Sequence, residues 1–230
     1  MRSYKIGVEH VVILRNMVAR HLTVPHEFVC VCDTEDKARD LDQFGIRALP
    51  LDMTKHVPGT CFVRLMLRHP MMGAFLGRRV LNLDVDICIV GNIDHIANRH
   101  EENVWWENPN FKPGNRRAPI QTSIQLLTTG TLTHLWSEFD PKITPQWVNR
   151  RYGGAEQAWV SEMLNAGPNV RTLDQSDGIY GAMRVFRGEE GEGVNGQLPA
   201  NASIVSFPGD RAPWQSEVQE QFPWLKEHYR

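Results

Sequence analysis

Apolar residues occur in two different patterns in the first fifty positions of the chain, one with helical spacing and one in short continuous runs. Between Val8 and Leu22 the apolar residues recur at helical spacing, which predicts an amphipathic helix. The stretch "HEFVCVCD" that follows is a short apolar run typical of a strand. "TEDKARDLDQFG" then predicts a helix with Thr34 as its N-cap and Gly45 as its stop, and "IRALPL" predicts a second short strand.

The same two patterns recur through the rest of the chain. "TCFVRLMLRHPMM" predicts a helix with Phe62, Leu65 and Met66 on one face, and "RRVLNLDVDICIV" predicts one mostly buried strand. Further strands are predicted in "NVWWEN", "PIQTSIQLL" and "ASIVSF", and further helices in "TGTLTHLWSEF" and "GAEQAWVSEMLNAG". The stretch from Glu107 to Pro119 is rich in Pro, Gly and Asn and predicts a loop within the domain.

Strands that alternate with helices predict an α/β fold with a mostly parallel central sheet flanked by helices. A chain of 230 residues is long enough for one sizeable core, so we expect a single domain over residues 1–230. Such sheets usually begin with a strand, yet only seven residues precede the first predicted helix. We therefore expect the first strand to be short or missing.

Composition and charge remove several classes of function. A net charge of −2 gives no electrostatic reason to expect binding to nucleic acid or an anionic membrane. No apolar stretch is long enough to span a bilayer, and the start "MRSYKIGVEH" lacks the apolar core of a signal peptide, so a cytoplasmic protein is expected. The four cysteines show no zinc-ligand spacing and are expected to be reduced thiols.

Two aspartates end the most apolar of the predicted strands. Asp84 and Asp86 follow "RVLNL", and ligands of open α/β sheets gather beyond the carboxyl ends of strands. Residues two apart in a strand point to the same side, so both carboxylates are expected to address one cation. Mn²⁺ or Mg²⁺ accepts one or two carboxylates and completes its coordination with phosphate oxygens and water. This pattern predicts a site for a nucleoside diphosphate, although two solvated aspartates at a strand end would look the same.

Several motifs together resemble one enzyme family. The stretch "FVRLMLRHPMMGAFLGRRVLNLDVDICIVGNIDHI" is similar to the central block of GT-A-fold glycosyltransferases of the glycogenin and bacterial galactosyltransferase-like family (glycosyltransferase family 8). "IQTSIQLLTTG", "GGAEQAWVSEML" and "IVSFPGDRAPW" resemble that family's later strand, its "G-D-Q" helix start and its closing "H-F-x-G-x-x-K-P-W". The resemblance implies a hexosyltransferase that moves a sugar, with retention of configuration, from a nucleoside-diphosphate sugar to an acceptor that it does not identify. A UDP-linked sugar is the expected donor, and neither a membrane span nor nucleic acid is involved.

The resemblance also implies roles for individual residues. Asp84 and Asp86 would bind the metal, with Ser206 at the position of a third ligand. Gln157 and Glu156 would stand beside the reacting carbon of the sugar as the catalytic residues. The remaining residues that would bind the nucleotide-sugar are Arg64, Gln121, Gly209 and Trp214.

The chain departs from the family pattern at several of these positions. Ser206 replaces a metal-binding His, and Ala212 replaces a phosphate-contacting Lys, with Arg211 beside it as a possible substitute. Gln121 replaces Asn, Glu156 replaces Asp, and Ala158 replaces an acid. These replacements leave open a catalytically decayed scaffold that binds a nucleotide, a glycan or a protein without turnover. A haloacid-dehalogenase-like phosphatase is a more remote alternative, because its "DxDxT" motif would place Cys88 at the threonine.

Aromatic and basic residues outside these motifs allow two interpretations each. Trp105 and Trp106 are expected on opposite faces of a strand, with one of them exposed towards an acceptor unless both pack in the core. Arg116 and Arg117 flank a predicted loop and are either solvated or suited to an acceptor that carries phosphate. His10 is expected at the surface.

Overall fold

The computed structural model describes residues 6–51, 61–152, 156–165, 170–187, 196–207, 209 and 211–230. The expected short first strand and most of the Gly-rich stretch after Arg187 lie outside these ranges. The chain divides into two compact units, and each is described by itself. Unit 1 comprises Met1–Pro50, Leu83–Arg99 and Asp174–Arg230, and unit 2 comprises Leu51–Asn82 and His100–Leu173. The prediction of a single domain stays a prediction.

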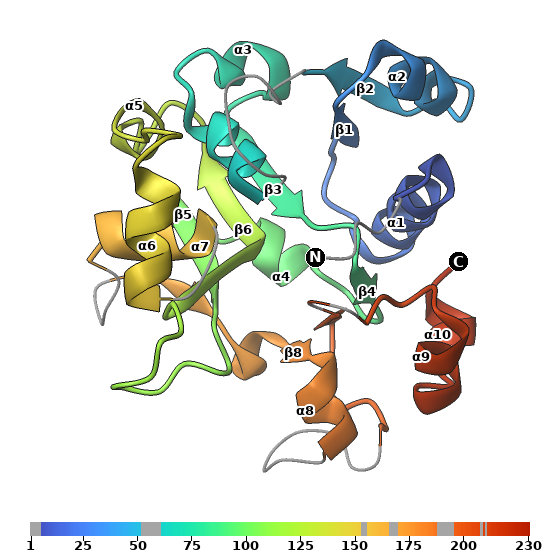
Figure 1. Ribbon diagram of the computed structural model, residues 1–230. Coiled ribbons are helices and arrows are strands. Elements are labelled where there is room, and N and C mark those ends of the chain that lie inside the picture. Colours follow the sequence, from blue (N-terminus) through green and yellow to red (C-terminus); the bar gives the residue numbers. More distant parts are fainter. Residues whose placement is uncertain are drawn as a thin grey trace. The chain divides into compact units, whose positions relative to one another are not determined.

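Unit 1 contains two small sheets and the helices that pack on them (Figure 1). Strands β1 and β2 form a parallel pair, and β4, β9 and β8 form a three-stranded sheet in that order. Its elements are α1 Val8–His21, β1 Val29–Cys32, α2 Glu35–Asp42, β2 Arg47–Pro50, β4 Ile87–Ile89, α4 Asp94–Ala97, η2 Gln175–Asp177, β8 Ile179–Gly181, α8 Ala182–Arg187, β9 Ile204–Ser206, α9 Ser216–Gln221 and α10 Leu225–His228.

The first helices of unit 1 confirm the sequence-based prediction. Helix α1 spans the apolar repeat and buries Leu14, Met17 and Val18. Thr34 caps α2, because its side chain accepts a hydrogen bond from the Lys37 N–H. Gly45 follows the end of α2 with φ +68°, a left-handed conformation that costs glycine little.

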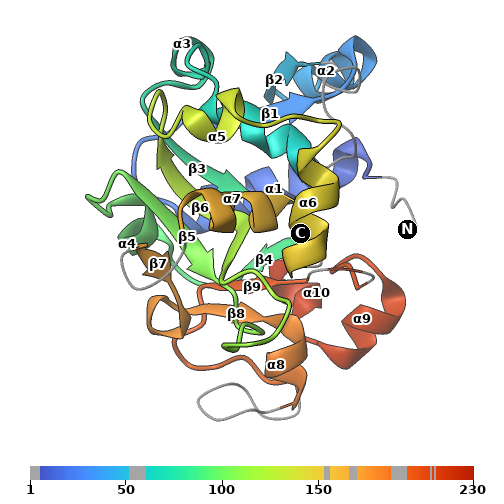
Figure 2. The same cartoon turned by 60° about the vertical axis from the view of Figure 1, so that its left-hand side comes forward.

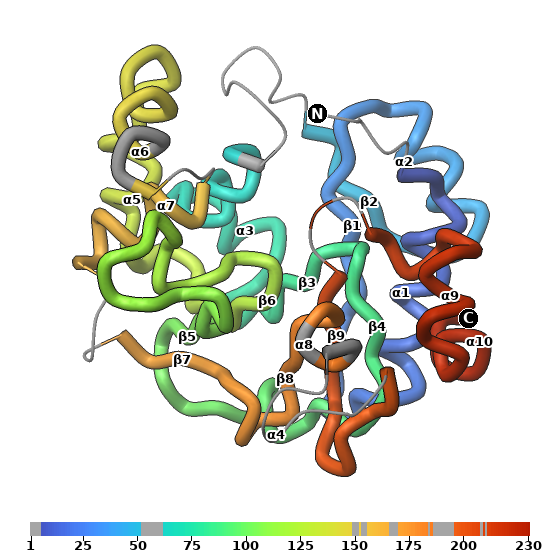
Figure 3. Tube along the Cα trace, turned by 60° about the horizontal axis from the view of Figure 1, so that its bottom comes forward, coloured from blue at the N-terminus to red at the C-terminus, as the bar shows by residue number. Residues whose placement is uncertain are grey.

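Helices α9 and α10 run beside α1 in the tube view (Figure 3). Arg20 of α1 donates hydrogen bonds to the carbonyl oxygens of His228 and Arg230, at 2.6 and 2.7 Å. Leu225 of α10 is fully buried, and α10 also contacts β4. The C-terminal segment is therefore part of the core of unit 1.

Unit 2 is built on a four-stranded sheet with the order β3-β6-β5-β7 (Figure 2). Its elements are η1 Cys61–Arg68, α3 Met72–Leu76, β3 Arg79–Leu83 (Leu83 itself being assigned to unit 1), β5 Asn103–Glu107, β6 Ile120–Thr128, α5 His134–Ser137, α6 Thr144–Tyr152, α7 Glu156–Met163 and β7 Thr172–Leu173. The helix predicted from "TCFVRLMLRHPMM" is a 3₁₀ helix, η1, and its Phe62, Leu65 and Met66 are all buried, as predicted.

The α/β fold is confirmed, and its sheets contain antiparallel as well as parallel pairs. Strands β5 and β6 are antiparallel, as are β4 and β9, whereas β1–β2, β5–β7 and β8–β9 are parallel. The loop Glu107–Pro119 explains the first of these pairs. A loop without a helix can join antiparallel neighbours, whereas a parallel pair needs a crossover such as α2 between β1 and β2.

Trp105 and Trp106 are both buried, so the interpretation that both pack in the core is confirmed. The register of β5 against β6 shifts between these two residues: Trp105 lies opposite Gln125 and Trp106 lies opposite Gln121. Residues 122–124 of β6 therefore form a bulge. Three residues on one strand face no residue on the other, which interrupts the regular alternation of the side chains between faces.

The cysteines agree with the expectation of reduced thiols. Cys30, Cys32 and Cys88 are free, and burial raises the pKa of Cys30 to about 11. The side chain of Cys61 is outside the described part. Within the residues that the structure describes, no helix is long and apolar enough to cross a lipid bilayer.

Asp94 ties the end of α1 to α4 and generates a prediction about acid stability. The hydroxyl and the backbone N–H of Thr23 both donate to its carboxylate, and these hydrogen bonds lower the pKa of Asp94 to about 2. A lowered pKa stabilises the folded state above pH 4 and loses this contribution as the pH falls towards 2. We expect Asp94→Asn to be less stable than wild type at pH 7, with a difference that shrinks between pH 4 and pH 2.

Urea unfolding across that pH range measures the difference. The control is Asp42→Asn, which alters an exposed carboxylate of α2 and is expected to change stability by less than about 0.5 kcal/mol at pH 7. A difference between wild type and Asp94→Asn that stays constant from pH 7 to pH 2 would contradict the assignment.

Candidate functional site

The two aspartates of the D-x-D motif lie in a turn between β3 and β4. Strand β3 ends at Leu83, Asp84 follows it directly, and β4 begins at Ile87 after the turn Val85–Asp86. The prediction of one continuous strand through this motif is therefore wrong, and strand alternation does not fix the direction of the two carboxylates. Both side chains are half-buried. Their position just beyond the carboxyl end of β3 agrees with the sequence-based prediction.

The closing segment of unit 1 lies against this turn. Ser206 on β9 is paired with Ile87 on β4, and the Phe207 N–H donates to the carbonyl oxygen of Asp86 at 2.9 Å. Ser206 is buried, with 1% of its surface exposed. The structure thus brings Ser206 next to the D-x-D turn, as the resemblance implies. Gly209 is exposed with φ +86°, and its neighbours Pro208 and Asp210 lie outside the described residues.

Trp214 stacks on His10 within unit 1. Their ring centroids are 4.0 Å apart with an interplanar angle of 21°, and the Tyr229 hydroxyl lies 3.4 Å from Nδ1 of His10. His10 is buried, which corrects the expectation of a surface position, and this burial lowers its pKa. Burial also raises the pKa of Tyr229, and its electrostatic interactions with Cys88 and Asp86 add to the effect. The Trp214 cluster and Asp86 therefore share one neighbourhood.

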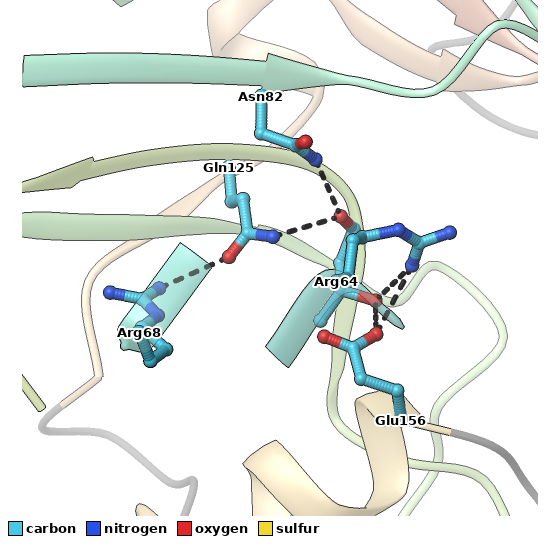
Figure 4. Close-up of polar contacts among 6 residues, drawn as sticks. Arg64, Arg68, Asn82, Gln125 and Glu156 are labelled. Atoms are coloured by element: carbon cyan, nitrogen blue, oxygen red, sulfur yellow. Dashed lines mark hydrogen bonds and ion pairs between the residues drawn. The ribbon is translucent and has the colours of Figure 1, made fainter. Parts of the chain in front are cut away.

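Arg64, Thr122 and Glu156 form a hydrogen-bonded triangle in unit 2 (Figure 4). Arg64 Nη1 donates to Thr122 Oγ1 at 2.8 Å and to Glu156 Oε2 at 3.1 Å, and the Thr122 hydroxyl donates to the same carboxylate. Glu156 has 2% of its side chain exposed and Arg64 has 23%. The structure thus joins two of the predicted site residues and adds Thr122, which sequence reasoning missed.

A second arginine carries its positive charge into the same network. Arg68 is buried, donates to Asn103 Oδ1 and to Gln125 Oε1, and places its guanidinium 5.4 Å from the ring centroid of Trp105. Loss of hydration lowers the pKa of Arg68 to about 10, and the charge of Glu156 opposes this shift. Asn82 and Gln125 both donate to the carbonyl oxygen of Thr122 at 3.4 Å.

Burial also dominates the acid of this network. The pKa of Glu156 is raised because the carboxyl has lost its hydration, although Arg64, the Thr122 hydroxyl and Arg68 oppose the shift. Gln157, the next residue of α7, is half-buried, and so is Gln121, which directly precedes Thr122 on β6. A buried carboxyl with a raised pKa is a common feature of functional sites, and structural ion pairs also produce it.

Two signals in the sequence could have indicated the residues that were missed. Arg68 follows Arg64 by four positions, a spacing that places both on one side of a helical segment. Thr122 lies between Ile120 and Ile124 at the spacing of an inward-facing strand position, where a polar residue needs a partner. The β6 bulge itself left no comparable signal in the sequence.

The donor atoms of the D-x-D turn suit a hard divalent cation. In the described part of the chain, no group of three or more His, Cys, Asp and Glu side chains is placed to hold a metal ion. A cation at Asp84 and Asp86 would therefore take two carboxylates and fill its other positions with phosphate oxygens and water, as Mg²⁺ and Mn²⁺ do in nucleotide sites. The residues fit such an ion by the type of donor atom, and the metal remains a proposal.

Comparison with solved structures finds proteins with a similar fold. The chain is similar to the glycosyltransferase GlyE of Streptococcus pneumoniae TIGR4, with a TM-score of 0.55 and 12% identity over 91% of this chain and 54% of that one. The apo form of the same enzyme gives a TM-score of 0.53 and 11% identity, over 91% of this chain and 53% of that one. The chain spans about half the length of these structures. At this identity the likeness shows a fold shared with a glycosyltransferase.

Sequence comparisons add no family. No protein-family profile matches the chain, and no curated protein sequence matches it. Membership of the glycogenin and bacterial galactosyltransferase-like family therefore stays a prediction. The fold, together with the D-x-D turn and the buried network of unit 2, carries the functional argument.

The raised pKa of Glu156 predicts how its neutral analogue behaves. A carboxyl with a raised pKa makes the folded state lose stability as the pH rises, because the unfolded chain releases the proton more readily. We expect Glu156→Gln to lie within about 1 kcal/mol of wild type near neutral pH and to gain on it as the pH increases. Glu156→Ala removes the acceptor of Arg64 and Thr122 and leaves a cavity, so we expect it to cost about 2–3 kcal/mol.

Urea unfolding of both variants measures these effects. The control is Glu138→Gln, which neutralises an exposed carboxylate of the same unit and is expected to have little effect. If wild type instead gains stability over Glu156→Gln as the pH rises, the attraction of Arg64 outweighs the cost of burial and the assigned direction is wrong.

Proposed function

We propose that this protein is a glycosyltransferase that moves a sugar from a nucleoside-diphosphate sugar, with a UDP-linked sugar as the first candidate, to an acceptor. The observation that carries the proposal is the Asp84–Asp86 turn beyond the carboxyl end of β3, in a chain whose fold is shared with a glycosyltransferase. Ligands of α/β sheets bind at this end of a strand.

The transfer of a sugar requires positive charge where the diphosphate departs. Asp84 and Asp86 would hold Mn²⁺ or Mg²⁺, and the bound ion would supply charge that stabilises the leaving group. Ser206 has a hydroxyl oxygen where the family has a histidine nitrogen, and it lies beside this turn on β9. A serine hydroxyl is a weaker metal ligand than the nitrogen of a neutral imidazole, so we expect weaker retention of the metal than a histidine would give.

The sugar itself develops positive charge as the bond to the diphosphate breaks. A carbonyl or a carboxylate near its reacting carbon stabilises that charge. The family resemblance assigns this position to Gln157 and Glu156. The fully buried Glu156 is fixed by Arg64 and Thr122, which supports a role in which a carboxyl must hold one orientation. The half-buried Gln157 has the amide carbonyl that the same role requires.

Ser206 favours a second function, a scaffold of the same fold that binds a nucleotide without turnover. This residue has 1% of its surface exposed. Its pairing in the β4–β9 ladder gives it a structural role that needs no metal. The two functions differ in a measurable way, because the scaffold would bind UDP and form no product.

Binding of nucleotide to the D-x-D turn predicts a metal-dependent gain in stability. UDP at one hundred times its dissociation constant, in the presence of Mn²⁺, should add roughly 2.7 kcal/mol to the free energy of unfolding. For a protein of this size the melting temperature should rise by about 5–10 °C. We expect Asp84→Ala/Asp86→Ala to lose this increase, because the ion that links the protein to the diphosphate would lack its carboxylates.

Thermal unfolding with and without Mn²⁺ measures the effect, and release of UDP from UDP-sugars measures turnover. The control Asp40→Ala/Asp42→Ala makes the same change in charge at exposed positions of unit 1 and should retain the full increase. An increase that is unchanged in Asp84→Ala/Asp86→Ala would overturn the metal assignment. Binding of UDP without turnover of any UDP-sugar would favour the scaffold.

A further inference from the structure

Residues 108–118 between β5 and β6 form a loop with its own hydrogen bonds, here called the basic arm. At its base Asn108 is buried, donates from Nδ2 to the Ala118 carbonyl at 2.6 Å, and accepts at Oδ1 from the Asn110 N–H at 3.0 Å. Further out, Asn115 donates to the Asn110 carbonyl at 2.9 Å and accepts from the Arg117 N–H at 3.1 Å. The loop therefore has a defined shape without helix or strand.

The tip of this arm is exposed and cationic. Every residue from Lys112 to Arg117 is exposed, and the tip includes Gly114 in a turn at φ +89°. Among the residues that the structure describes, neither Lys112 nor Arg117 makes a side-chain hydrogen bond or ion pair, and Arg116 adds a third cation beside them. The sequence contains no Asp or Glu from position 108 to position 137. A chain with a net charge of −2 thus concentrates positive charge on one braced loop.

The arm leads directly into the buried network of unit 2. Thr122, which contacts both Arg64 and Glu156, follows Arg117 by only five positions. Five residues span at most about 18 Å even when fully extended. The cationic tip is therefore close enough to the Arg64–Thr122–Glu156 network for one extended ligand to contact both. The proposed function assigns that network to the reacting sugar.

We propose that the basic arm binds the phosphate group of a water-soluble ligand. The binding of phosphate does not depend on the proposed function. The identification of this ligand as the acceptor of the sugar rests on it. Guanidinium groups match phosphate oxygens with paired donors, and a loop held in shape by Asn108 and Asn115 loses little entropy when it binds. The arm is unsuited to membrane insertion. The exposed large apolar residues of the described chain are Ile6, Phe44, Met71, Phe75, Ile143 and Trp147, all outside the arm.

Direct binding of inorganic tripolyphosphate tests the site without a donor or turnover. Isothermal titration compares wild type with Lys112→Gln/Arg117→Gln, which removes two cations of the tip and should weaken binding about tenfold. The control Arg78→Gln/Lys142→Gln removes two exposed cations elsewhere in unit 2 and should retain the affinity of wild type. Asn115→Ala keeps every charge and removes the bracing, so it should weaken binding several-fold.

The outcomes separate an organised site from general charge attraction. Equal losses in the arm variant and the control, or full affinity in Asn115→Ala, would overturn the proposal. Binding to phosphatidylglycerol vesicles but not to tripolyphosphate would overturn the assignment to a soluble ligand. The increase in melting temperature with UDP and Mn²⁺ should persist in the arm variant. The two proposals can therefore fail separately. A missing increase with UDP and Mn²⁺ would not affect the result for tripolyphosphate, and a missing effect on tripolyphosphate binding would not affect the result for UDP.

Discussion

The bulge in β6 is the constraint on which the interior of unit 2 depends. Residues 122–124 face no partner on β5, so Thr122 and Gln125 both turn towards the two arginines of η1. Glu156 and Arg68 are buried charges, and buried charge is tolerated only where hydrogen bonds replace the lost hydration. In a regular ladder, residues three apart would point to opposite faces, so Thr122 could not contact Arg64 while Gln125 contacts Arg68.

The need of a carboxylate for water or a polar partner is met differently in unit 1. Asp84 and Asp86 follow an apolar strand but lie in a turn, where half-buried carboxylates keep access to water or to a ligand. The backbone around them is fixed by the Phe207 N–H and by the β4–β9 pairing. Unit 1 therefore fixes the backbone of this turn through main-chain hydrogen bonds. Unit 2 fixes its carboxyl through side chains.

The sequence predicted best where local chemistry decides the structure. Helix α2 is an example, because Thr34 and Gly45 define its ends without help from the rest of the chain. The sequence predicts the D-x-D motif at the end of an apolar run, but it also predicts one strand that continues through the motif, because "VDICIV" extends the apolar pattern beyond Asp84. The pairing of β5 with β6 and its register are set by contacts between two separate segments, which the local pattern of apolar residues does not specify. Neither the bulge nor the burial of both tryptophans could be derived from the spacing of apolar residues alone.

The positions at which the chain differs from the pattern of the resembled glycosyltransferase family have a feature in common. The resemblance predicts an acid at Ala158 and a lysine at Ala212, and both alanines are buried, with 0% and 3% of their surfaces exposed. A charge at either position would need a partner within a packed interior. Glu156 has one more methylene than the aspartate that the resemblance predicts, and it contacts both Arg64 and Thr122. Of these three positions, only Glu156 carries an ionisable side chain, and there hydrogen bonds compensate for the loss of hydration.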